Sequence, residues 1–191
     1  MQAKIIHLKE KKSFMNFYDD ILKLLEDSYR TTGGKYPAME WLDEKPDYFD
    51  PNLEHKFREA YGKFLEWRLT QELDELFLLF LNDALVGSIA LTLTFEGKSI
   101  GWIPEKCQNN QYGFIELFVV RSQYRGKGYG VKLLSVAMRR LKELKRKPLI
   151  VTFPNLKALN YYLKLGGVEK ERFKGYVIVD LTSVMETLIS R

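Results

Sequence analysis

Three glycines, each two residues from the next, lie between a short apolar segment and a helical pattern. They belong to the run Arg125-Gly126-Lys127-Gly128-Tyr129-Gly130, shortly after an apolar stretch at 112–120. Glycine removes side chains where a backbone must approach a bulky anion, and the first amides of a helix have no intrahelical acceptor. Those amides can donate to phosphate oxygens, assisted by the helix dipole. The run therefore predicts a pyrophosphate site at the start of a helix.

Two common phosphate-binding motifs do not fit this run. A P-loop requires Gly-x-x-x-x-Gly-Lys-Ser/Thr, which the sequence does not contain. The dinucleotide fingerprint Gly-x-Gly-x-x-Gly fails as well, because these glycines are spaced two apart and lie far from the N-terminus. What remains is Arg-x-x-Gly-x-Gly. This pattern resembles the acyl-CoA-binding motif of the GNAT superfamily, the GCN5-related N-acetyltransferases.

A second segment resembles a later motif of the same family. Asn155 is followed by Ala158 three residues on and by Tyr162 four residues beyond that. The family motif ends in Gly, usually followed by Phe, whereas here Gly166 is followed by Gly167. We expect this departure to alter local packing and not the cofactor contacts.

The resemblance also implies the residues that bind the cofactor, acetyl-CoA. The backbone at the end of the 112–120 strand would pair with the pantetheine arm, as an added strand pairs with a sheet edge. Arg125, Lys127 or Lys157 would lie near the CoA phosphates, although plain surface charge is an equal alternative for the two lysines. The implied cofactor-binding residues are Phe118, Val119, Val120, Arg125, Gly126, Lys127, Gly128, Tyr129, Gly130, Asn155, Lys157 and Ala158.

Two further residues are candidates for catalysis. An alkylammonium has a pKa near about 10.4, so a base must remove a proton before the amine can attack a thioester. Glu116 interrupts the apolar strand and resembles the catalytic glutamate of several GNAT enzymes; the alternative is a glutamate in solvent or in a salt bridge. Tyr162 matches the tyrosine that many GNAT enzymes place near the thioester sulfur. Tyr161 would point to a different helix face and is expected to pack.

The resemblance thus implies an acetyl-CoA-dependent N-acetyltransferase that transfers an acetyl (acyl) group to a primary amine by direct attack. Glu116 would be the base, acting directly or through water, and Tyr162 the acid. A catalytically silent CoA-binding regulatory domain of the same fold is the alternative. Retention of both residues favours the enzyme.

Hydrophobic periodicity predicts the elements that must position these residues. Strands are expected at 4–8, 73–81, 84–95, 112–120, 148–153 and 173–181, and helices at 14–29, 52–69, 128–145 and 156–165. Antiparallel strands followed by strand, helix, strand and helix indicate a mixed α/β (α+β) sheet. With the resemblance, this implies a GNAT-like fold with a mostly antiparallel sheet of six or seven strands and about four helices. A single domain over 1–191 is expected, with its acyl-CoA-binding core at 112–167.

Composition excludes several other function classes. Cys107 is the only cysteine, and His7 and His55 lack metal-ligand spacing, so no metal site or disulfide is expected. The net charge is +5, but the basic group at 139–147 has no interleaved aromatic residues and reads as a solvated helix end. No apolar run approaches the roughly 20 residues of a membrane span, and residues 1–10 are polar. A cytoplasmic protein with neither nucleic-acid nor membrane partners is expected.

Two long connections, 31–51 and 96–111, are expected to carry substrate specificity. The first combines several acids with Trp41, Tyr48 and Phe49, which suits a cationic amine such as a polyamine, an aminoglycoside, a lysine or a peptide N-terminus. A solvated acidic loop is an equal alternative. The sequence leaves open the choice among small-molecule and peptide amines, and acetyl against longer acyl donors. The sequence does not distinguish whether residues 182–191 form a tail or a homodimer contact.

Overall fold

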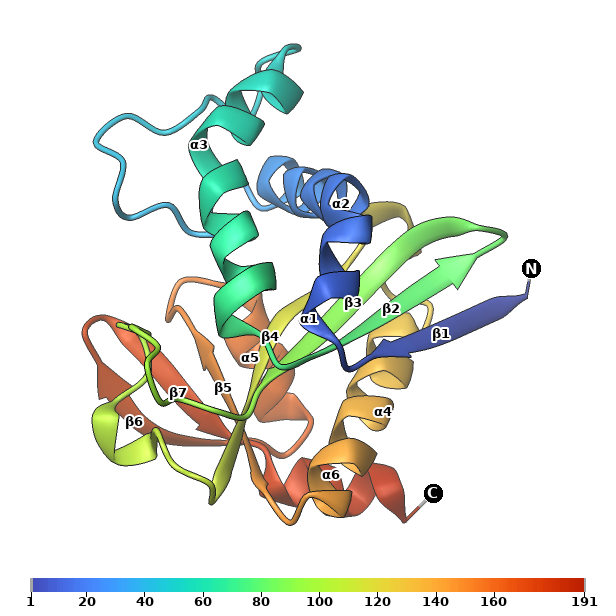
Figure 1. Cartoon of the computed structure of the whole chain (residues 1–191), viewed down its shortest axis with the longest axis vertical. Helices are drawn as coiled ribbons and strands as arrows, with labels where there is room; N and C mark the ends of the chain where they lie inside the picture. Colours follow the sequence, from blue (N-terminus) through green and yellow to red (C-terminus); the bar gives the residue numbers. More distant parts are fainter. Residues whose placement is uncertain (1, 191) are drawn as a thin grey trace.

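A single sheet of seven strands organises the computed structural model, which describes residues 2–190 (Figure 1). The strand order is β1-β2-β3-β4-β5-β7-β6, and every pair is antiparallel except β4 with β5. The strands are β1 (Ala3–Leu8), β2 (Glu75–Leu81), β3 (Ala84–Thr92), β4 (Tyr112–Val120), β5 (Lys147–Thr152), β6 (Val168–Phe173) and β7 (Tyr176–Asp180). The predicted mixed, mostly antiparallel sheet is confirmed, with seven strands.

Helices cover both faces of this sheet. The helices are α1 (Lys11–Phe14), α2 (Tyr18–Thr31), α3 (Leu53–Trp67), α4 (Tyr129–Glu143), α5 (Lys157–Lys164) and α6 (Thr182–Ile189). Alternating side chains of β2 show the two layers, because Leu76 and Leu78 pack with α2 and α3, whereas Phe77 and Leu79 pack with α4. Figure 1 shows α1, α2 and α3 on one side of the strands and α4 with α6 on the other.

The α3 face of the sheet carries two separate hydrophobic clusters. Helices α2 and α3 pack over β2, β3 and the end of β4. The connection 96–111 packs over the other half, where Ile100, Ile103 and Cys107 contact Phe114 and Ile178. The boundary between the two clusters lies beside β4, where the candidate site is found.

Two elements at the C-terminal end differ from the sequence prediction. The expected strand 173–181 corresponds to β7, but the sequence did not predict β6, which precedes it and is joined to it by a turn in which Lys174 and Gly175 have φ angles of 49° and 82°. Strand β6 is an edge strand with mostly exposed charged side chains, so it lacks the apolar alternation that identifies a strand. Residues 182–189 form α6, and its buried Val184 packs in the core shared with α4. The sequence did not distinguish whether this end of the chain is a tail or a dimer contact.

Helix α3 ends in a π-helical turn. The sequence predicts one helix over 52–69, but the regular helix stops at Trp67 and residues Arg68–Glu72 form the wider turn before β2. Such turns occur often at functional sites. Within residues 2–190, no helix has the length and apolarity that a membrane crossing requires.

Candidate active site

A β-bulge in β4 positions Glu116. In the pairing with β3, Ser88 faces Val119 and Ala90 faces Glu116, so β4 contains one more residue than β3 over this interval. Leu117, inside the bulge, has a φ angle of 44°, and its carbonyl accepts a hydrogen bond of 2.7 Å from the Ser88 hydroxyl. The extra residue lets Glu116 and Leu117 both lie on the α3 side of the sheet.

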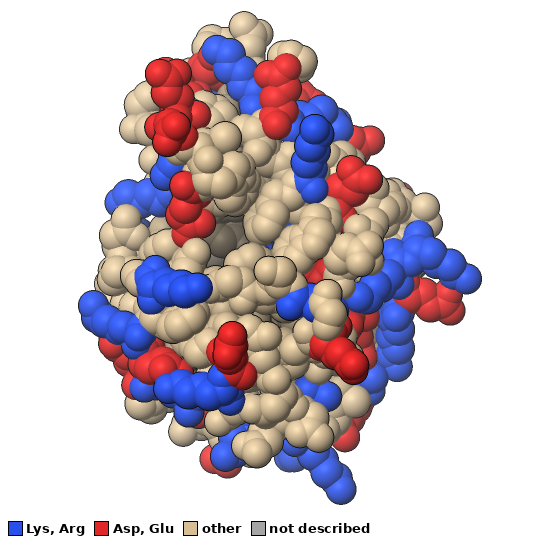
Figure 2. Space-filling model, turned by 60° about the vertical axis from the view of Figure 1, so that its left-hand side comes forward, with Lys and Arg blue, Asp and Glu red and all other residues tan. Residues whose placement is uncertain are grey.

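The bulge coincides with a separation of two strands. Strand β4 pairs with β5 only as far as Ile115 with Ile150. Beyond that pair, residues 116–120 and 150–153 line opposite walls of a cavity of about 1170 Å³. Figure 2, viewed from the side of segment 31–51, shows a hollow with acidic and basic side chains around it. The separated strands therefore create a deep site in the middle of the sheet.

Glu116 is held at both carboxylate oxygens. Its Oε2 accepts a hydrogen bond of 2.6 Å from the Arg68 guanidinium, and its Oε1 accepts one of 3.0 Å from the Trp102 indole. Arg68 also donates to Glu72 Oε2 at 2.6 Å, and Glu72 is fully buried. Of the two sequence interpretations for Glu116, a base or a salt-bridged glutamate, the structure shows the ion pair. The carboxylate still lines the cavity.

The surroundings of Glu116 raise its pKa to about 7. Burial is the largest cause, and the charge of Glu72 adds to it; Arg68 and the Trp102 hydrogen bond oppose the change. A carboxylate that takes part in an ion pair can therefore still gain and lose a proton near neutral pH. That property suits a general base.

Tyr162 reaches the same cavity from α5. Its side chain is only 5% exposed, packs against Phe118 at a ring distance of 6.3 Å, and lines the cavity. Burial and the nearby Tyr36 raise the pKa of the Tyr162 hydroxyl, so it keeps its proton at neutral pH. Tyr161, the next residue, is 36% exposed, as expected for a different helix face.

The glycine turn lies between β4 and the start of α4, where the sequence predicts it. Gly126 and Gly128 have φ angles of 75° and 82°, and a Cβ on either would meet no atom within 4 Å. Gly128 is the N-cap of α4, and its carbonyl accepts the first helical hydrogen bond, from Lys132 at 3.1 Å. The amides that follow Gly128 have no acceptor inside the helix. The open turn can therefore admit a bulky anion against the helix start.

Arg125 has a structural task that the sequence does not reveal. Its Nε donates to the Val120 carbonyl at 2.8 Å, and Nη1 donates to the Thr31 hydroxyl at 3.0 Å. These bonds tie the end of β4 to the end of α2. The first bond takes one of the two lone pairs of the Val120 carbonyl.

Most of the expected cofactor residues line the cavity together. The set comprises Phe118, Val119, Val120, Arg125, Asn155, Lys157 and Ala158, together with Glu116 and Tyr162. Residues 126–130 are not among the lining residues of the described chain, but they follow Arg125 directly at the edge of the cavity. The Lys127 ammonium lies 5.4 Å from the centre of the Tyr124 ring.

The opposite wall of the cavity contains residues that the sequence analysis named, Glu40 and Trp41, and others that it missed. The other wall of the cavity is formed by segment 31–51, α3 and connection 96–111, through Tyr36, Glu40, Trp41, Tyr61, Phe64, Arg68 and Trp102. Arg68 and Glu72 carried a signal, because two opposite charges four residues apart alternate with buried Leu65, Leu69 and Leu73. Trp41 was among the residues of segment 31–51 expected to carry specificity, whereas Tyr61 and Phe64 on α3 carried no signal, since rings at helical spacing usually belong to a core.

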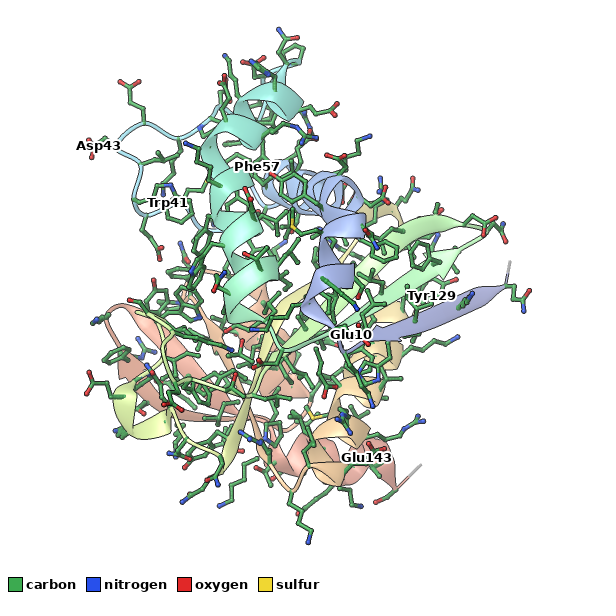
Figure 3. All side chains as sticks on the ribbon, viewed as in Figure 1. Glu10, Trp41, Asp43, Phe57, Tyr129 and Glu143 are labelled. Atoms are coloured by element: carbon green, nitrogen blue, oxygen red, sulfur yellow. The ribbon has the colours of Figure 1, made fainter. Side chains whose placement is uncertain are left out.

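Segment 31–51 contributes less negative charge to the cavity than its composition indicates. Of the acidic residues in this fully described segment, Glu40 alone lines the cavity. Its carboxylate accepts a hydrogen bond of 2.7 Å from the Tyr176 hydroxyl across the cavity. Figure 3 shows Trp41 turned towards α3, whereas Asp43 points away from the molecule. The rings of Tyr48 and Phe49 lie 4.3 Å apart at an angle of 42°, outside the lining.

Gly167, where the family motif usually has an aromatic residue, has no room for a side chain. A Cβ there would lie 2.8 Å from the Tyr162 carbonyl and 2.9 Å from side-chain atoms of Leu181 and Val179. The departure therefore brings the end of α5 close to β7. It leaves the cavity-facing side of α5 in place.

A mixed sheet that opens beside β4, next to a glycine turn leading into a helix, is the fold of an acetyltransferase. The chain belongs to the acetyltransferase (GNAT) family, whose model matches residues 36–167. No curated protein shows significant similarity to it.

Solved structures agree with this assignment. A Pyrococcus horikoshii protein assigned provisionally as an acetyltransferase is 40% identical, with a TM-score of 0.74 over 93% of this chain and 96% of that chain. The PaiA N-acetyltransferase of Thermoplasma acidophilum, in complex with coenzyme A, is 15% identical, with a TM-score of 0.63 over 94% and 98%. A GCN5-related N-acetyltransferase of Ralstonia eutropha is 15% identical, with a TM-score of 0.55 over 91% and 97%. The last two show a shared fold.

Proposed function

We propose that the protein transfers an acetyl (acyl) group from acetyl-CoA to a primary amine by direct attack. One observation carries the proposal: Glu116, whose pKa is raised to about 7, and Tyr162, whose hydroxyl stays protonated, line the same cavity. A group that accepts a proton and a group that donates one are both needed when an amine displaces a thiolate. Family membership supports the acetyltransferase class.

The residues at the glycine turn fit coenzyme A. The space beside Gly126 and Gly128 is open where side chains would otherwise stand, and the first amides of α4 suit a pyrophosphate. Asn155 and Ala158, which follow β5, and Phe118 and Val119, from β4, line the same cavity, where the pantetheine arm would lie. The cofactor supplies the acetyl group as an activated thioester.

Glu116 and Tyr162 have complementary tasks. Glu116 accepts a proton from the substrate ammonium, directly or through water, and leaves a neutral amine that attacks the thioester carbonyl. Tyr162 donates a hydrogen bond and then a proton to the leaving sulfur, whose thiol pKa is about 8.5, and the proton that the nitrogen loses as the amide forms returns to Tyr162 through solvent. Arg68 and Trp102 fix the Glu116 carboxylate so that it needs no rearrangement before it accepts the proton.

A thiol-release assay tests this proposal. The protein is incubated with acetyl-CoA and a panel of amines that includes monoamines, polyamines, aminoglycosides, amino acids and basic peptides, and free CoA is measured. Amine-dependent CoA release is expected. Tight CoA binding by calorimetry without release for any amine would contradict the proposal and favour a silent CoA-binding domain.

A further inference from the structure

We infer that the acceptor is a monoamine carried on a flat aromatic body, bound along a row of aromatic rings that leads to Glu116. This inference rests on the proposed function and deepens it, because it names the substrate class. It is carried by the arrangement of rings on the α3 side of the cavity and by the balance of charges around them.

The rings form a continuous row from the protein surface to the base. Trp41 lies 4.7 Å from Phe64, and Phe64 lies 5.9 Å from Trp102, measured between ring centres. Tyr61 flanks the row, 6.1 Å from Trp41 and 5.5 Å from Phe64. All four side chains line the cavity. These distances are those of favourable aromatic contacts, so the row is a stable wall.

The inner end of the row contacts the proposed base directly. Trp102 donates its indole hydrogen to Glu116 Oε1 at 3.0 Å. An amine whose nitrogen reaches Glu116 along the row of rings would place its adjacent carbon atoms against Trp102 and Phe64. A flat apolar group there would bury area on both partners and stack on the rings.

The outer end of the row is exposed. Trp41, in segment 31–51, is 47% exposed, and Figure 3 shows it turned towards α3. Phe49, in the same segment, is 75% exposed but lies outside the lining. Trp41 is thus an apolar surface at the entrance, next to rings that continue inward.

The charges disfavour a polycation. Among the described residues, the lining carboxylates are those of Glu40 and Glu116, and both already accept hydrogen bonds within the protein. The cations that line the same cavity are Lys35, Arg68, Arg125, Lys157 and Lys174. Arg68 is paired with Glu72 and Glu116, and Arg125 and Lys157 are expected near the CoA phosphates, which leaves Lys35 and Lys174 beside Glu40. The second ammonium of a polyamine would therefore meet more positive than negative charge, whereas a single ammonium is matched by Glu116 alone.

Three amines test the inference in the thiol-release assay: phenethylamine, propylamine and spermidine. We expect kcat/KM for phenethylamine to exceed the other two values by at least about tenfold, because one ring is buried. Equal values for phenethylamine and propylamine, or a preference for spermidine, would overturn the inference while the proposed function stands. If none of the three amines causes CoA release, the proposed function is contradicted. In that case the affinities of the amines for the CoA-bound protein are measured by calorimetry. A Kd for phenethylamine that is no lower than the Kd for propylamine overturns the aromatic assignment.

Trp41 and Phe49 provide a matched pair of variants. Trp41→Ala should raise KM for phenethylamine by about three- to tenfold, with kcat and the kinetics of propylamine nearly unchanged. Trp41→Phe should restore most of the affinity, and Phe49→Ala should change neither parameter. An equal loss for both amines in Trp41→Ala would show that the ring supports the fold and does not bind substrate.

Discussion

The Arg68 guanidinium donates to the Glu116 carboxylate at 2.6 Å, joining residues 48 positions apart in the chain. Arg68 lies in the π-helical turn after α3, and Glu116 lies at the bulge of β4. Arg68 also donates a hydrogen bond to Glu72, so one buried cation is shared between two carboxylates. This shared cation explains why Glu116 can be paired and still have a pKa of about 7, because the burial and the charge of Glu72 outweigh it.

Replacing Glu116 should remove the pH dependence that its raised pKa creates. The deprotonated form is the base, so kcat/KM should rise between about pH 6 and pH 8 as Glu116 loses its proton. Glu116→Gln should lower kcat/KM by about 10²-fold or more and abolish this rise, while a second rise from the amine near about pH 10 remains. Glu143→Gln, which changes an exposed carboxylate on α4, is the control. An unchanged pH profile in Glu116→Gln would exclude the residue as base.

Changes at Arg68 and Glu72 should move the same titration in opposite directions. The Arg68 charge lowers the pKa of Glu116 and the Glu72 charge raises it. Arg68→Met should therefore shift the kcat/KM profile to higher pH, and Glu72→Gln should shift it to lower pH. Both profiles are measured by initial rates over pH 5 to 9, a range of about two units around the titration. Shifts of the same sign would contradict the shared-cation arrangement.

Loss of Arg68 should also reduce stability. Arg68→Met leaves two buried carboxylates without their cation, for which we expect a decrease of about 3–5 kcal/mol in the free energy of unfolding. Urea denaturation measures it. The double variant Arg68→Met with Glu72→Gln should recover part of the loss, because one of the two carboxylates is then neutral. If the double variant recovers no stability, the loss in Arg68→Met does not come from the unpaired carboxylates.

Tyr162→Phe should slow the chemical step without weakening CoA binding. Removing the proton donor is expected to lower kcat by about 10²-fold, because the leaving thiolate is no longer protonated. Tyr161→Phe tests the neighbouring, partly exposed hydroxyl and should change kcat less than about twofold. Full turnover in Tyr162→Phe on a verified substrate would remove the acid role.

Gly128→Glu should weaken CoA binding. The new carboxylate would stand at the start of α4 and repel the pyrophosphate, so we expect the Kd for CoA to rise by at least about tenfold in calorimetry. Gly97→Glu is a matched control, because Gly97 has a φ of 73° in equally open surroundings away from the glycine turn. If both variants bind CoA as the unchanged protein does, the pyrophosphate assignment is wrong.

The sequence by itself determined the sheet class, most elements and the residues of the glycine turn. Local spacing carries this information, because Gly128 must adopt a positive φ at a helix start wherever the chain places that helix. Strand β6 and α6 escaped prediction, since an exposed edge strand and a short terminal helix show no strong period.

Only the tertiary structure decided how the chemistry is assembled. Glu116 and Arg68 meet because a bulge in β4 and a π-helical turn after α3 turn both side chains into one cavity. Trp41 joins the same wall because segment 31–51 folds back on α3. The bulge changes the register by one residue, and the contact between Arg68 and Glu116 joins distant parts of the chain. Neither leaves a local sequence pattern, and the pKa of Glu116 depends on both.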